Sequence, residues 1–139
     1  MTTEQLIQRF ETGDVPTESF HHSDHVQLAF AYLSMYPPLK ALGKFSEALK
    51  GYAEARGKSG LYHETIRLAY FFLIRERMAR RPGLGWDEFA RRNPDLLEWK
   101  PGILSHYYHE ATLKSDLARG VFLFPDKCDA DVRQGLKPS

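Results

Sequence analysis

LYHETIRLAYFFLIRERMAR, residues 61–80, is the stretch that decides the fold. Its middle, Leu68 to Ile74, is apolar. A helix that is apolar nearly all round is usually central to its domain, so we expect this one at the centre of the core. The loop GKSG (57–60) precedes the segment and Pro82 ends it. The sequence therefore predicts a helix over about 61–80, the longest in the chain.

Prolines, glycines and helix-capping residues divide the rest of the chain into further helical segments. Strand signals are almost absent, with no Asn-Gly hairpin and no clean two-residue alternation. We therefore predict an all-α fold, a compact single-domain bundle of five to six helices. Besides residues 61–80, the expected helices cover residues 4–11, about 20–36, 39–56, 86–92 and roughly 101–108; residues 115–122 could add a last turn or two.

The size and composition of the chain fit one globular domain. Its 139 residues are 42% hydrophobic, which is enough for a core without disulfides or metal staples. We expect a single domain over residues 1–139, with an ordered core over about 3–125 and a polar, loose tail over 126–139.

Charge and cysteine content limit the expected partners and location. The formal net charge of +1 gives no general attraction to nucleic acid or anionic membranes. The most apolar run, residues 68–74, is too short to cross a bilayer. Cys128 is the single cysteine, so no intramolecular disulfide can form. We expect a cytoplasmic protein that binds no nucleic acid and no membrane, with a homodimer as one possible assembly.

Two histidines near the start of the second helix fall on one face of it. In the segment FHHSDH (20–25), His22 and His25 share a helical stripe with Ala29 and Leu33. The opposite face carries polar residues. We therefore expect both imidazoles on the buried face, about one turn apart.

A third histidine begins the 61–80 helix. His63 continues through Ile66, Tyr70 and Ile74, so it also points inward. If the two helix starts meet, His22, His25 and His63 form a three-nitrogen site. Three protein ligands leave a coordination position open for water or substrate, and imidazole favours zinc, iron or a similar divalent transition metal.

Neighbouring residues supply candidates for chemistry at this site. Asp24 and Glu64 each adjoin a candidate ligand and could move protons, and Tyr62 is a third candidate catalytic residue. Candidate substrate-binding residues are Thr65, Lys58 and Tyr70.

Three functions are compatible with these residues. The first is a metal-dependent enzyme acting on a small molecule, for example a hydrolase, lyase or oxygenase. The second is a non-enzymatic module that binds or senses a small molecule or metal in a polar, histidine-lined pocket. The third is a structural protein whose histidines are core residues. The sequence assigns no role to His21, His106 and His109.

Several segments together carry a resemblance. FHHSDH (20–25) and GLYHETI (60–66), followed by YFFLIRERM (70–78) and WDEFARRNPDLLEWK (86–100), resemble a family of small uncharacterised bacterial helical proteins. The likeness covers roughly residues 20–125 and implies that both histidine segments belong to one domain. The architecture is also similar to three-histidine metal-binding bundles of the DinB type, although this chain lacks their full histidine spacing.

Overall fold

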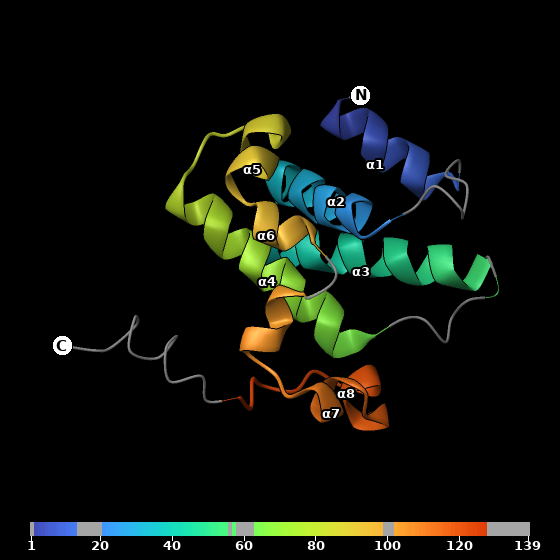
Figure 1. Ribbon diagram of the computed structural model, residues 1–139. Coiled ribbons are helices and arrows are strands. Elements are labelled where there is room, and N and C mark those ends of the chain that lie inside the picture. Colours follow the sequence, from blue (N-terminus) through green and yellow to red (C-terminus); the bar gives the residue numbers. More distant parts are fainter. Residues whose placement is uncertain (1, 14–20, 56, 58–62, 99–101, 128–139) are drawn as a thin grey trace.

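The computed structural model describes residues 2–13, 21–55, 57, 63–98 and 102–127. Within these ranges the chain forms eight α-helices, five of them at least seven residues long, one 3₁₀ helix and no strand, which confirms the all-α prediction (Figure 1). The elements are α1 (Thr3–Glu11), α2 (His22–Met35), α3 (Pro38–Ala55), α4 (Glu64–Arg80), α5 (Trp86–Arg92), α6 (Pro94–Leu97), η3 (Ile103–His106), α7 (Glu110–Leu113) and α8 (Asp116–Gly120).

Local capping explains where several helices begin. The Thr2 hydroxyl accepts the Gln5 N–H and the Gln5 side chain accepts the Thr2 N–H, a capping box at the start of α1. Gly13, just beyond α1, has a φ of 78°, a left-handed conformation that suits glycine. The helix predicted over 86–92 is observed as α5 with the same bounds.

The sequence misjudged three features of the helices. The longest helix is α3, with 18 residues against 17 for α4. The short helix α6 was not predicted; Pro94 starts it, because a proline is well suited to the first helical position. In the segment predicted over 101–108, the described helical residues are the four of η3.

The most enclosed helix is α2, which packs against α1, α3, α4 and α6. Residues 28–32 of this helix are all buried, and Ala29 and Ala31 allow its neighbours to approach closely. The expectation that the 61–80 helix is the central one was therefore wrong. One side of α4 is open to solvent, where Phe72 remains 47% exposed. The prediction failed because an apolar run indicates burial but does not tell on how many sides a helix has neighbours.

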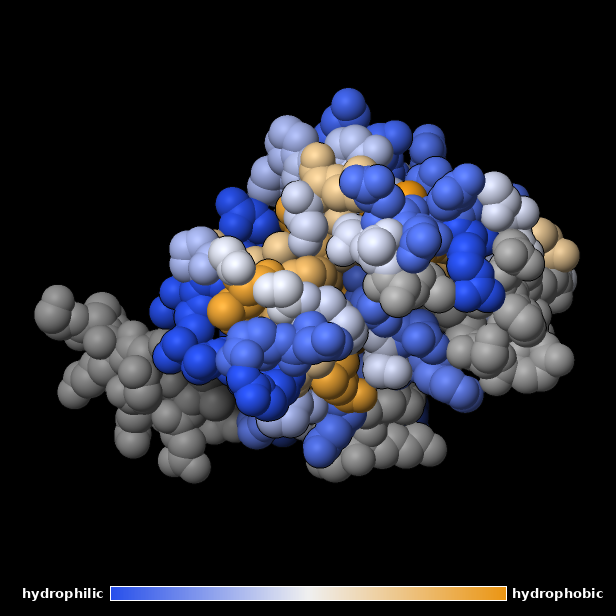
Figure 2. Space-filling model, turned by 90° about the horizontal axis from the view of Figure 1, so that it is seen from above, coloured by the Kyte–Doolittle hydropathy of each residue, from blue (hydrophilic) through white to orange (hydrophobic). Residues whose placement is uncertain are grey.

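The core lies between α2, α3 and α4 and is rich in aromatic side chains. Phe45 of α3 stacks on Phe71 of α4, and Phe30 of α2 contacts Trp86 and Phe89 of α5. Hydrophilic residues cover much of the face seen in Figure 2, with smaller apolar areas between them. No helix among the described residues has the length and apolar character needed to span a membrane.

The C-terminal segment, residues 107–127, lies beside the N-terminal end of α4 and includes α7 and α8 (Figure 1). Asp126 accepts hydrogen bonds from the His109 N–H and the Thr112 hydroxyl. The Lys127 N–H donates to the Tyr107 carbonyl. The tail predicted to be loose from residue 126 is therefore bonded at Asp126 and Lys127, and residues 128–139 lie outside the described ranges.

Candidate functional site

The ring of His63 joins the start of α4 to α7. Its Nδ1 accepts the Ile66 N–H at 3.1 Å, which makes His63 the N-cap of α4. Since Nδ1 accepts, the ring proton is on Nε2, which donates to the Leu113 carbonyl at 2.7 Å. Both nitrogens of this candidate metal ligand are thus engaged with backbone groups.

Thr65, a candidate substrate-binding residue, is fully buried and binds the C-terminal segment instead. Its hydroxyl lies 2.7 Å from the Ala118 carbonyl and 2.9 Å from the Val121 carbonyl, and it accepts the Leu123 N–H at 3.1 Å. The single hydroxyl proton serves one carbonyl at a time. The hydroxyl therefore satisfies backbone groups around α8.

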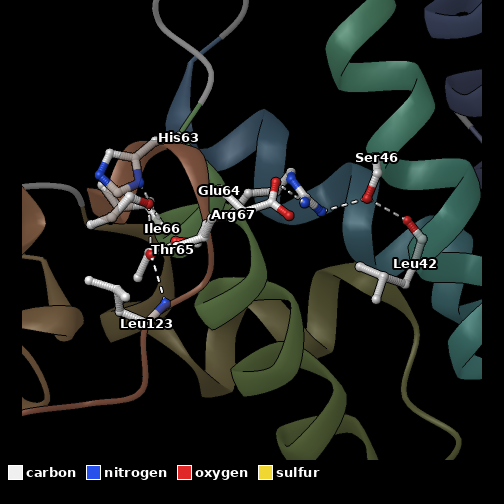
Figure 3. Close-up of polar contacts among 10 residues, drawn as sticks. Leu42, Ser46, His63, Glu64, Thr65, Ile66, Arg67 and Leu123 are labelled. Atoms are coloured by element: carbon white, nitrogen blue, oxygen red, sulfur yellow. Dashed lines mark hydrogen bonds and ion pairs between the residues drawn. The ribbon is translucent and has the colours of Figure 1, made fainter. Parts of the chain in front are cut away.

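Glu64, a candidate catalytic residue, is paired with the buried Arg67, which lies about one turn further along the same face of α4 (Figure 3). The Arg67 Nη2 lies 2.6 Å from a Glu64 oxygen, and its Nη1 donates to the Ser46 hydroxyl of α3 at 2.5 Å. Ser46 in turn donates to the Leu42 carbonyl. The carboxylate of Glu64 thus helps to hold α4 against α3.

The first turn of α2 holds the other two candidate ligands. His21 is the N-cap residue, and its N–H donates to Asp24 Oδ2 at 2.8 Å, so this candidate catalytic carboxylate stabilises the helix start. His22 is half-buried and His25 is exposed. The sequence placed both rings on the buried face; by accessible area this is correct in part for His22 and wrong for His25.

The His22 ring is fixed against α4 and α6. Its Nε2 lies 3.0 Å from the Leu96 carbonyl, and because a carbonyl only accepts, Nε2 carries the proton. The ring meets the Tyr70 ring edge-on, with 4.6 Å between centroids. Burial lowers the pKa of His22, and the bond to Leu96 opposes that shift. His22 is therefore held as a neutral imidazole of known tautomer.

The His25 ring contacts solvent, and its pKa is strongly lowered. Desolvation by the surrounding protein, aided by the nearby His22, lowers its pKa to about 4. Its accessible area is nevertheless that of an exposed side chain. Water therefore reaches the ring, although the surrounding protein disfavours its charged form.

Tyr70, a candidate substrate-binding residue, is buried beside η3 and α6. Burial raises its pKa to about 12, the Ile103 backbone opposes that shift, and the charge of Asp95 adds to it. Its ring also forms one wall of the His22 environment. Tyr70 thus connects the start of α2 with the α6–η3 region.

An open hollow of about 330 Å³ lies at the junction of α6 and η3, and we call it the α6–η3 hollow. Its position follows from two contacts: Leu96, next to Asp95, holds His22, and Ile103 adjoins Tyr70. The His22–Tyr70 ring pair therefore lies directly behind its wall. The lining residues are Asp95, Glu98, Gly102, Ile103, Ser105, His106 and Tyr107.

The structure brings together some of the predicted residues and separates others. His22, His25 and Tyr70 are neighbours, whereas the described contacts of His63, Glu64 and Thr65 lead to α3, α7 and the region of α8. Among residues 2–13, 21–55, 57, 63–98 and 102–127, no group of three or more His, Cys, Asp or Glu side chains is arranged to hold a metal ion. The candidates Lys58 and Tyr62 lie outside the described residues.

The hollow was missed by the sequence reasoning apart from His106, to which no role was given. No local sequence signal marks Asp95, Glu98 and Ser105, and the tertiary structure places them around one hollow. The one usable signal was the concentration of polar and aromatic residues around Pro101 and Gly102, which interrupt helices.

Comparisons with protein-family models, curated proteins and solved structures gave no match to this chain. The resemblance to small bacterial helical proteins and to DinB-type bundles therefore stays an expectation.

Proposed function

We propose that the protein is a non-enzymatic binding module that takes up a small polar molecule in the α6–η3 hollow. The observation that carries this proposal is a hollow of about 330 Å³ whose lining includes the polar side chains of Asp95, Glu98, Ser105 and His106. Small-molecule sites are typically concavities of about 300–1,000 Å³ with a few fixed polar groups. Here the Arg77–Asp95 pair and the His22–Leu96 bond fix the wall.

The arrangement of the candidate catalytic groups supports binding over catalysis. Asp24 and Glu64 are engaged in a helix start and an ion pair, and His63 uses both ring nitrogens. A general base needs to reach the proton that it abstracts. In their described positions these groups serve the fold.

A screen of small polar molecules by ¹H–¹⁵N NMR tests the proposal. We expect binders to shift the amide signals of Gly102, Ser105 and Tyr107. The variant Ser105→Trp fills the hollow and should abolish these shifts, whereas Ala79→Trp, at an exposed position of α4, should retain them. Binders that shift other regions only, or that bind Ser105→Trp equally well, would contradict the proposal.

The second candidate is the metal-dependent enzyme, with His22 and His25 as ligands of zinc, iron or a similar ion. One observation favours it: a carbonyl that orients a neutral imidazole through its N–H, as Leu96 does for His22, is the usual partner of a metal-binding histidine. His63 would have to give up a backbone bond to become the third ligand.

Elemental analysis of protein purified without an affinity tag tests this candidate. About one metal per chain, reduced by His25→Ala and unchanged by His109→Ala, would support it. A content near zero, together with a melting temperature that added Zn²⁺ does not raise, would exclude it.

We further propose a cytoplasmic location, because the single cysteine fits a reducing compartment. The formal charge of +1 supports a small molecule over nucleic acid or a membrane as the partner. A homodimer stays one possible assembly, which the molecular mass in solution would decide.

A further inference from the structure

Two carboxylates line the α6–η3 hollow, and they differ in how their charge is balanced. Arg77 binds Asp95 with two parallel bonds, Nη2 to Oδ2 at 2.9 Å and Nη1 to Oδ1 at 3.1 Å. These bonds hold the pKa of Asp95 below its usual range. Asp95 is thus ionised and paired. Glu98 makes no ion pair with any of the described residues. Within the described part of the chain, the lining therefore carries one uncompensated negative charge.

Among the residues that the structure describes, other cations near the hollow do not cancel that charge. Arg77 is committed to Asp95 and also donates to Asn93 Oδ1 at 2.8 Å. The Lys127 ammonium donates to the Ser105 carbonyl at 2.9 Å. An anionic ligand would meet the carboxylate of Glu98. The balance of charge among the described residues therefore favours a ligand with a single positive group.

The remaining lining suits a cation that carries a short apolar part. Tyr107 is half-buried, so its ring face is held in place, and an aromatic face attracts ammonium and guanidinium groups. Ile103 is buried at the base and offers an apolar surface for methylene groups. The Asp95 oxygens each accept one bond from Arg77 and retain lone pairs for a further donor.

We infer that the ligand of the α6–η3 hollow carries an ammonium or guanidinium group on a short apolar chain, with Glu98 as its counter-ion and Tyr107 as its aromatic contact. This inference rests on the proposed function, because it specifies the ligand class of the same hollow. Glu98 supplies the charge, Tyr107 the ring contact and Ile103 the apolar contact.

Four matched probes test the inference by NMR titration: n-butylammonium, n-butylguanidinium, 1-butanol and butyrate. The two cations should shift the Gly102, Ser105 and Tyr107 amides and bind at least tenfold more tightly than butanol or butyrate. Added salt should weaken their binding, because the attraction to the exposed Glu98 is screened.

Glu98→Gln keeps the shape of the side chain and removes its charge. It should therefore weaken the binding of the cations at least fivefold and leave the affinity for butanol unchanged. Glu54→Gln changes the net charge equally at an exposed position of α3 and should have no effect. Equal affinity for butanol and butylammonium, or an unaltered cation affinity in Glu98→Gln, would overturn the inference while leaving the hollow as a binding site. If the binders of the broader polar screen also fail to shift the hollow, the proposed function fails with it.

Discussion

The first turns of α2 and α4 begin alike but serve different purposes. Each helix has a histidine as its N-cap, His21 for α2 and His63 for α4. In α4, the cap ring and the next residues bind α3, α7 and the region of α8. In α2, the described long-range hydrogen bond of the first turn is that of His22 to Leu96, and His25 remains in contact with solvent.

The difference shows how to separate structural from functional histidines. A ring whose two nitrogens both contact backbone groups has a fixed tautomer and a structural role, as at His63. A ring that contacts solvent, as at His25, remains accessible to a ligand. The start of α4 therefore belongs to the fold, and the start of α2 adjoins the candidate binding site.

Removing Arg67 should have the largest effect on the α4 side of the comparison. Its side chain is 6% exposed and that of Glu64 is 25% exposed, so Arg67→Ala leaves a carboxylate partly desolvated and Ser46 without its donor. We expect a loss of about 3 kcal/mol in the free energy of unfolding, the lower end for breaking a buried pair. Urea denaturation measures it. Arg80→Ala, in an exposed pair with Glu76, should cost less than about 0.5 kcal/mol; equal losses would refute the distinction.

Thr65→Val should have the next largest effect. The substitution keeps the shape of the side chain, but it deprives Ala118, Val121 and Leu123 of a buried hydrogen-bond partner. We expect a loss of about 2 kcal/mol, since a buried polar group without a partner costs about 1–3 kcal/mol. Thr112→Val, whose hydroxyl binds the exposed Asp126, provides the control and should cost clearly less. A neutral Thr65→Val would show that the C-terminal segment is held by other contacts.

His63→Ala should cost about 1 kcal/mol for the lost cap, with a smaller addition for the bond to Leu113. Asparagine is a strong N-cap residue, so His63→Asn should recover most of the cap contribution. Thermal unfolding followed by circular dichroism would compare the three proteins. Equal stability of the alanine and asparagine variants would show that His63 does not stabilise the protein as a helix cap.

On the α2 side, replacing His25 should have the smallest effect on the free energy of unfolding at neutral pH. The effect should become visible as the pH is lowered. The pKa of His25 falls from 6.5 to about 4 on folding, so below pH 6.5 the unfolded chain binds more protons than the folded one. The free energy of unfolding should therefore decrease as the pH falls from about 6.5 to 4. His25→Gln should flatten this dependence, and Ser23→Ala on the same turn should leave it unchanged. Parallel curves for the parent and His25→Gln would contradict the perturbed pKa.

The fold could be read from the sequence because its signals are local. Prolines, glycines and capping residues mark the helix ends, and α5 was predicted to the residue. The central position of α2 could not be read from hydropathy, since it depends on how many neighbours surround a helix. The short helices α6 and α7 follow from tight turns that single-residue signals describe poorly.

The candidate site could be predicted only in part. Helical spacing correctly placed His22 towards α4, where it meets Tyr70. The same spacing could not show that the His63 ring would bind the Leu113 carbonyl, because Leu113 lies 50 residues further along the chain. The lining of the α6–η3 hollow likewise combines residues from α6 and from the region of η3. The pattern of residues in the sequence thus does not predict hydrogen bonds to backbone groups that are distant along the chain.

The contacts of Thr65 have a consequence for the order of folding. They join residues 53 to 58 positions apart, so the chain must close a long loop before they form, at a cost in entropy. The partners of Thr65 exist only once α4 has begun and α8 has turned. We therefore expect α2, α3 and α4 to assemble first, and the chain beyond residue 107 to dock onto that scaffold as a late step.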